Sequence, residues 1–195
     1  MTDDTVDAVF PTETVLSDGS VFRVVPVETG VRAIRAWAEY PWPMSPAQAL
    51  ALRDRLGWTS SPTDERMFTT DHDLEEKDAS FTTVEAGGDT RTVVSFNLSL
   101  TSRIPKPVRA EAVPTAERAF NAYVEALTVI YGQGARSRSR GVLSVTWTLP
   151  NDALVNIGTI GRVVSADVDS PAGNEAARGE AQYFDEIADE NDPAR

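Results

Sequence analysis

The chain contains no cysteine among its 195 residues. This absence excludes disulfides, thiol nucleophiles and cysteine-based zinc sites. No apolar run approaches the roughly 18 residues that a membrane-spanning helix needs, so we expect no membrane span. The first ten residues, MTDDTVDAVF, are acidic where a secretion signal would begin with basic residues. A cytoplasmic protein is therefore expected.

Histidine is also scarce, and the single one, His72, lies in the acidic segment TTDHDLEEKD at residues 69–78. A calcium loop starting at Asp71 would place Glu76 at the required glycine and Thr82 at the bidentate glutamate. A transition-metal site would lack a second histidine. A serine triad would have to use His72, and the usual Gly-x-Ser-x-Gly turn is absent. We therefore expect no metal site and interpret the segment as a solvated acidic loop.

Other enzyme motifs are incomplete as well. The segment GQGARSRSRG at residues 132–141 lacks the Gly-Lys-Ser/Thr ending of a phosphate loop, and we interpret it as a solvated hairpin entrance. Hydrolysis by paired carboxylates needs two acids at a defined separation in a cleft, and spacing along the chain does not place them. We expect a protein that is not an enzyme and holds no cofactor. A carboxylate-based active site stays open as an alternative.

The net charge of −12 is concentrated at the two ends and in one central patch. Residues 1–20 carry five acids and no base, residues 174–195 seven acids and two bases, and residues 64–89 nine acids and two bases. Acidic surfaces repel nucleic acid and attract basic proteins. We therefore expect a basic protein partner, no nucleic acid and no membrane. A homodimer stays open.

Turn and capping signals divide the chain into three parts. We predict an acidic tail at residues 1–17, one domain at 18–171, and an acidic C-terminal segment at 172–195 with a helix near 180–188. Apolar residues at intervals of three and four predict helices at 31–40, 46–56 and 115–131. Alternating patterns predict strands at 21–25, 66–71, 79–85, 90–100, 142–150, 153–160 and 162–171.

Each of the last two predicted helices precedes three strands. This order predicts an α+β fold with an antiparallel sheet and helices on one face. It also suggests a duplicated α-β-β-β unit, with repeats at 45–101 and 114–171.

Several segments between residues 45 and 171 carry a resemblance. They are a helix ending in ALRDRLGW, the strand RMFTTD, the strand VTWTLP and the closing SP of VVSADVDSP. With these features the chain resembles small, uncharacterised actinobacterial proteins that are often encoded near secreted polymorphic toxins. The resemblance implies an immunity or chaperone-like role and brings no catalytic residues. The order of helices and strands is also similar to that of small acidic secretion chaperones.

The predicted function is protein binding without catalysis, in the form of an immunity-type inhibitor of a basic toxin domain. The alternative is a secretion or assembly chaperone, or adaptor, that holds a partner segment. An acidic lip is predicted to face arginines or lysines of the partner; its residues are Asp71, Asp73, Glu75, Glu76 and Asp78. Trp37 and Trp42, in the segment WAEYPWP, are candidate anchors for a partner, and packing in the core is the alternative for both.

Overall fold

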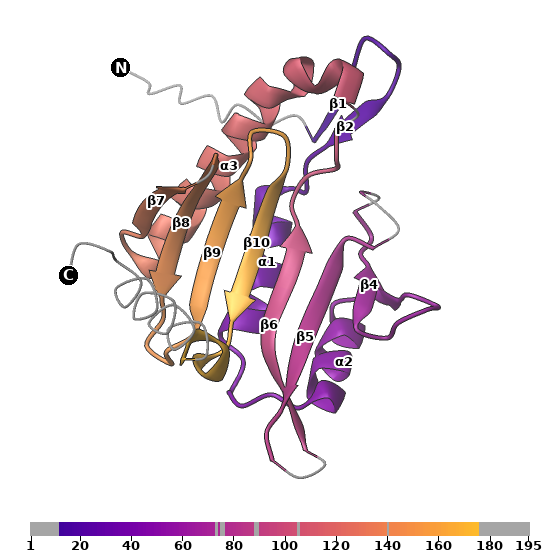
Figure 1. The fold of residues 1–195 in the computed structure, drawn as a ribbon. Helices are drawn as coiled ribbons and strands as arrows, with labels where there is room; N and C mark the ends of the chain where they lie inside the picture. Colours follow the sequence, from indigo (N-terminus) through magenta and orange to yellow (C-terminus); the bar gives the residue numbers. More distant parts are fainter. Residues whose placement is uncertain are drawn as a thin grey trace, which may run out of the picture.

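The computed structural model describes residues 12–175, apart from residues 73, 75, 76, 88, 89, 105 and 140. Its main element is an eight-stranded antiparallel sheet with the strand order β3-β4-β5-β6-β10-β9-β8-β7 (Figure 1). The strands are β3 (Thr59–Ser60), β4 (Met67–Thr69), β5 (Ala79–Glu85), β6 (Arg91–Ser99), β7 (Ala135–Ser139), β8 (Val142–Thr148), β9 (Leu154–Thr159) and β10 (Val164–Asp169). The predicted α+β class is confirmed.

The sheet consists of two four-stranded meanders, each preceded by a helix. Helix α2 (Pro46–Arg55) precedes β3 to β6, and α3 (Arg109–Tyr131) precedes β7 to β10. The meanders meet where β6 pairs with β10. The topology therefore repeats an α-β-β-β-β unit, with one strand more per unit than the pattern predicted.

The additional strands lie at the two edges of the sheet. Strand β3 has two residues, and β7 has the sequence ARSRS with all five residues exposed. Half of the segment at residues 132–141, which was interpreted as a solvated hairpin entrance, is therefore a strand of the hairpin itself, and its side chains are exposed as expected. Alternation of apolar and polar residues marks a strand only where one face is buried, and at β7 neither face is.

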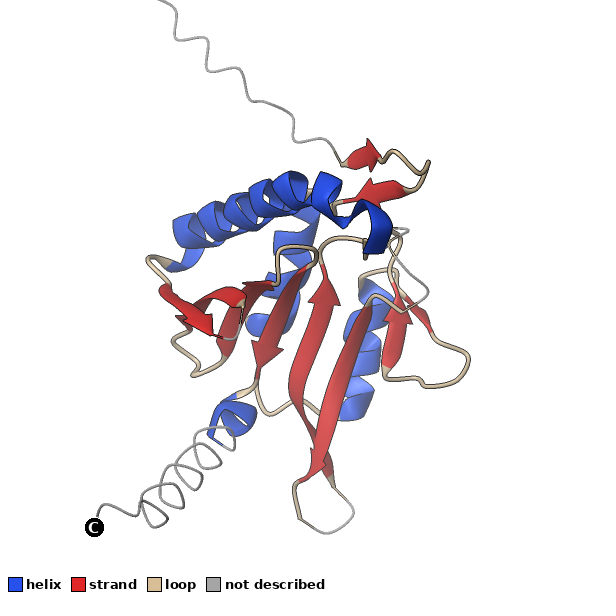
Figure 2. Cartoon of the chain, turned by 45° about the horizontal axis from the view of Figure 1, so that its top comes forward, coloured by secondary structure: helices blue, strands red, loops and turns tan. Residues whose placement is uncertain are grey.

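Three helices cover one face of the sheet, and in Figure 1 the sheet lies in front of α1 and α2. Helix α1 (Val27–Ala38) packs on β9 and β10, α2 on β6, and α3 on β9 and β10. Figure 2 shows the same arrangement after a 45° turn. No helix in the described part of the chain is long and apolar enough to cross a membrane.

Local sequence explains where the helices begin. At α2 the Ser45 hydroxyl accepts a hydrogen bond from the Gln48 backbone N–H, and the Gln48 side chain accepts one from the Ser45 N–H. This capping box confirms the predicted start of the helix. Helix α1 begins four residues before its predicted start, directly after Pro26. Helix α3 begins at Arg109, six residues early, and includes Pro114 within its first two turns.

The domain also extends further toward the N-terminus than predicted. Strand β1 (Glu13–Val15) pairs with β2 (Val21–Arg23) in a hairpin, and Leu16 between them is buried. Residues 13–17 thus belong to the folded domain and not to a tail. The acidic stretch before them, and the helix predicted near residues 180–188, lie outside the described residues.

Candidate functional site

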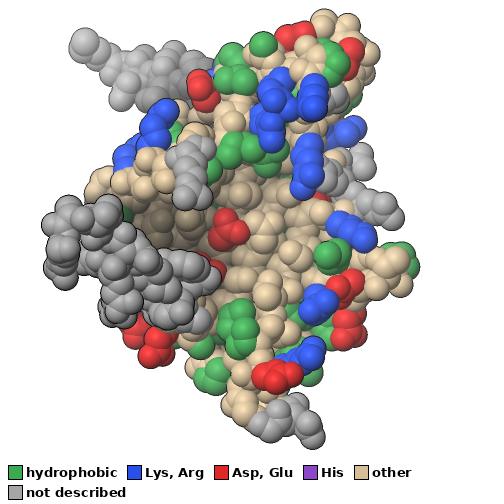
Figure 3. Space-filling model, in the orientation of Figure 1, with side chains coloured by type: hydrophobic (Ala, Val, Ile, Leu, Met, Phe, Trp, Pro, Cys, Tyr) green, Lys and Arg blue, Asp and Glu red, His purple; other side chains and the backbone are tan. Residues whose placement is uncertain are grey.

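None of helices α1, α2 and α3 packs on the second face of the sheet, which we call the uncovered face (Figure 1). Figure 3 looks onto this face and shows mostly uncharged polar side chains and backbone. Side chains alternate along each strand, so β6, β8, β9 and β10 direct most of their large apolar residues to the helices and mainly small polar residues outward.

Cross-strand pairing arranges the outward side chains in three rows. The middle row runs Ser80, Asn97, Asp167, Asn156 and Thr146 from β5 to β8. One neighbouring row contains Ser99, Ser165, Gly158, Ser144 and Ser137, and the other Thr82, Ser95, Asp169, Leu154 and Thr148. Hydroxyl and amide groups therefore surround two carboxylates on the central strand β10.

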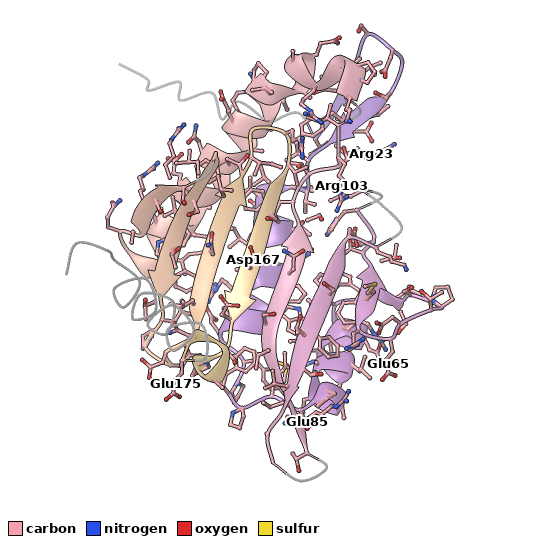
Figure 4. All side chains as sticks on the ribbon, in the orientation of Figure 1. Arg23, Glu65, Glu85, Arg103, Asp167 and Glu175 are labelled. Carbon is pink, nitrogen blue, oxygen red and sulfur yellow. The ribbon has the colours of Figure 1, made fainter. Side chains whose placement is uncertain are left out.

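Asp167 is the central residue of this face, and Figure 4 labels it within the sheet, away from Arg23 and Arg103. One carboxylate oxygen of Asp167 accepts a hydrogen bond of 2.7 Å from Asn97 Nδ2. Burial raises the pKa of Asp167, and the hydrogen bond from Asn97 opposes this shift. Burial and the charge of Asp167 both raise the pKa of Asp169. No described lysine, arginine or histidine forms an ion pair with either carboxylate.

A small cavity lies beside Asp167, with a volume of about 240 Å³. Its lining includes Ser144, Asn156, Gly158 and Ser165. A Cβ atom at Gly158 would meet only Asn156 Oδ1, at 3.8 Å, so the missing side chain leaves this space open. Asn156 Oδ1 is buried and accepts no hydrogen bond from any described residue. An orphaned buried acceptor costs stability, so the cavity places an unsatisfied oxygen close to an uncompensated carboxylate.

The unsatisfied oxygen of Asn156 and the uncompensated carboxylate of Asp167 distinguish the uncovered face from an ordinary solvated one. An antiparallel sheet can leave one face in water, and hydroxyl and amide side chains suit that role. A carboxylate in open water keeps its ordinary pKa, whereas burial disfavours the charged form. Asp167 and Asp169 both carry this burial cost, and no described cation offsets it.

Replacing Asp167 with asparagine is expected to stabilise the fold at pH 7 by about 1 kcal/mol. The raised folded-state pKa gives Asp167 its full stabilising contribution below the ordinary value of 3.8, and this contribution is lost as the pH rises through the folded pKa. The advantage of Asp167→Asn should therefore vanish near pH 3 to 4. Urea unfolding at pH 4 and pH 7 measures the difference in stability between the variant and the wild type. Glu117→Gln, at an exposed position of α3, is the control. A variant less stable than wild type at pH 7 would contradict the burial argument.

The structure separates the members of the predicted acidic lip. Asp71 is exposed, whereas the carboxylate of Asp78 accepts hydrogen bonds from the Thr70 N–H and hydroxyl, and Asp78 is only 1% exposed. Asp78 is thus a structural residue of the loop and cannot reach a partner. The other predicted members, Asp73, Glu75 and Glu76, lie outside the described residues.

His72 is held within the same loop. Its Nε2 lies 3.5 Å from Asp71 Oδ1, and its side chain is 10% exposed in a cavity that Arg32 and Arg55 also line. Among the described residues, no three acidic or histidine side chains gather closely enough to hold a metal ion.

The two predicted tryptophan anchors have different environments. Trp37 is 0% exposed and stacks on Phe96 with ring centroids 4.1 Å apart, so it is a core residue and forms no part of a surface. Trp42 is half-buried and lines a cavity of about 200 Å³ with Pro43, Thr92 and Pro171. Its Nε1 is buried and donates no hydrogen bond to any described residue. Of the two, only Trp42 borders a space that a partner could enter.

The sequence prediction missed the residues of the uncovered face. A signal existed in VSADVD at residues 164–169, where Asp167 and Asp169 alternate with buried Ala166 and Val168. Aspartate is depleted in strands, so two aspartates on one face of a central strand mark an unusual position. Their neighbours Asn97 and Asn156 come from distant segments, and only strand pairing brings the three segments together.

Fold and site together define a class: an α+β protein built on one antiparallel sheet, with helices on one face and a polar, acid-centred surface on the other. Residues 28–170 match the model of DUF6301, a family of unknown function. The chain belongs to this family. No curated protein and no solved structure matches it.

Proposed function

We propose that this chain is a non-enzymatic, cytoplasmic protein-binding protein whose uncovered face engages a basic partner. We further propose that the partner is a toxin domain, which the chain inhibits as an immunity protein. The observation that carries the binding role is the pair of partly buried carboxylates, Asp167 and Asp169, without a described cation at the centre of a polar surface.

The size of the face and the net charge of the whole chain support this role. Five adjacent strands at a spacing of about 4.8 Å give the rows a width of about 19 Å, enough for an extended segment or the rim of a domain. Hydroxyl and amide groups pair readily with polar partner groups, directly or through water. The net charge of −12 favours encounter with a basic partner and disfavours acidic ones.

The exposed part of the acidic lip is a second proposed contact. Asp71 remains available there, and Asp78 does not. The predicted roles of Asp73, Glu75 and Glu76 stay predictions. Binding that is insensitive to replacing Asp71, Asp73, Glu75 and Glu76 by asparagine or glutamine would remove the lip from the interface.

Replacing both Asp167 and Asp169 with asparagine is expected to weaken partner binding about tenfold or more, because two charge-assisted contacts are lost. A partner obtained by co-purification from the native host serves for calorimetry at low and high salt. The double variant Glu117→Gln and Glu125→Gln removes two charges from exposed positions on α3 and is the matched control. Equal losses in both double variants would indicate a general charge effect and would exclude the uncovered face as the site.

A chaperone or adaptor role is the second candidate, and the cavity at Trp42 favours it. That cavity is lined mainly by apolar groups, including Pro43, Val93 and Pro171, and its volume of about 200 Å³ suits one apolar side chain of a bound segment. Inhibition separates the two roles. An immunity protein restores growth of cells that express the toxin domain, whereas a chaperone keeps its partner soluble without abolishing its activity.

The raised pKa of Asp167 also favours a third candidate, a carboxylate-based hydrolytic site. Binding remains the better supported role, because the cavity lining includes Asp167 and not Asp169. Its volume of about 240 Å³ also falls below the roughly 300–1,000 Å³ that is usual for small-molecule sites.

A further inference from the structure

We propose that the cavity beside Asp167 is a binding site for a guanidinium group, supplied by an arginine side chain of the partner. This inference rests on the proposed function and specifies the contact at its centre. It stands on three observations: a carboxylate oxygen and, on the neighbouring strand, an amide oxygen that accept no hydrogen bond from the described residues, and a space left open at a glycine.

The two oxygens belong to directly opposed residues. Asp167 on β10 pairs with Asn156 on β9, and both line the cavity. Asn97 Nδ2 donates a hydrogen bond to Oδ1 of Asp167, and no described group donates one to Oδ2. Asn156 Oδ1 accepts no hydrogen bond from any described residue. Both acceptors therefore lack a hydrogen-bond donor at the same wall of the cavity.

A guanidinium group matches this wall better than an ammonium group does. Its planar fork carries five N–H donors that point in several directions, so one group can serve acceptors on two adjacent strands. An ammonium is a compact point charge that keeps its hydration more strongly. The hydroxyls of Ser144 and Ser165 offer further acceptors around the cavity. Asn156 Oδ1 reaches the entering group after a rotation about χ2, a broad and soft torsion for asparagine.

Gly158 determines the size of the site. A Cβ atom added at this position would make no close contact, because the nearest atom, Asn156 Oδ1, lies 3.8 Å from the ideal Cβ position. Valine suits a strand and would occupy the part of the cavity next to Asn156 without a clash at its Cβ. Gly158→Val is therefore expected to block the site while the protein stays folded.

The test is an NMR titration of the isotope-labelled full chain with N-acetyl-arginine methylamide. We expect saturable shifts of the side-chain amide signals of Asn97 and Asn156, and binding about tenfold or more weaker in Gly158→Val and in Asp167→Asn. The neutral citrulline analogue should give no such shifts, and the lysine analogue weaker ones. Thr14→Val is the control, because it introduces a valine into β1, outside the eight-stranded sheet. This variant should bind the arginine probe as the wild type does.

Three outcomes of the titration overturn the inference: absent shifts at millimolar arginine probe, equal shifts with citrulline, or unchanged binding in a folded Gly158→Val. Capture of the partner by the same variants distinguishes a failure of the guanidinium site from a failure of the proposed protein-binding function. Capture that still depends on Asp167 and Asp169 without probe binding keeps the function and removes the guanidinium site. Probe binding without any partner that depends on the face keeps the cation site and removes the protein-binding function.

Discussion

Replacing Trp37 with alanine is expected to lower the free energy of unfolding by about 3–5 kcal/mol. Trp37 is completely buried on α1, stacks on Phe96 of β6, and lies within 6.3 Å of the ring centroids of Phe68 and Phe81. Alanine would leave a cavity at the contact between α1 and the first meander of the sheet. Urea unfolding followed by far-UV circular dichroism measures the loss.

Trp42→Ala is the matched control, because it removes the same side chain from a half-buried position five residues further along the chain. We expect a smaller loss of stability there. If Trp37→Ala kept the stability of the wild type and lost partner binding, Trp37 would be an anchor on the surface and the core assignment would be wrong.

Replacing Asp78 with alanine is expected to lower the free energy of unfolding by about 2 kcal/mol, although Asp78 belongs to an acidic, loop-like segment. Its carboxylate accepts hydrogen bonds of 2.8 Å from the Thr70 N–H and 2.5 Å from the Thr70 hydroxyl, both buried. Alanine would leave these two donors without an acceptor. Burial raises the pKa of Asp78, so removing its buried charge offsets part of this loss.

Asp71→Ala tests the same loop at an exposed position, and its effect should stay within about 0.5 kcal/mol. The two variants separate the structural acid of the loop from the acid that is free to meet a partner. Equal stabilities of Asp78→Ala and Asp71→Ala would contradict the assignment of Asp78 to the loop's internal hydrogen bonds.

These variants show why side chains with the same chemistry take different roles. Trp37 and Trp42 flank one short segment, and Asp71 and Asp78 another. In each pair the residue with the structural role is buried by contacts beyond its immediate neighbours: Trp37 by strands β4, β5 and β6, and Asp78 by Thr70, eight residues earlier, and by backbone hydrogen bonds with Phe68 and Ser99. Burial is a property of the tertiary fold, and residue type alone did not predict it.

The sequence by itself determined the α+β class, the capping box at α2, the apolar spacing of α3 and the exact bounds of β5, because these depend on residues close together in the chain. It did not determine strand β7, which lacks a buried face, or the early starts of α1 and α3. Only the tertiary structure placed Asp167 between Asn97 and Asn156, residues 70 and 11 positions away, since the pairing of β6, β10 and β9 creates that row. The unpaired acceptors and the open space at Gly158 are likewise consequences of strand register, and a change of register by one residue would turn all of them toward the helices.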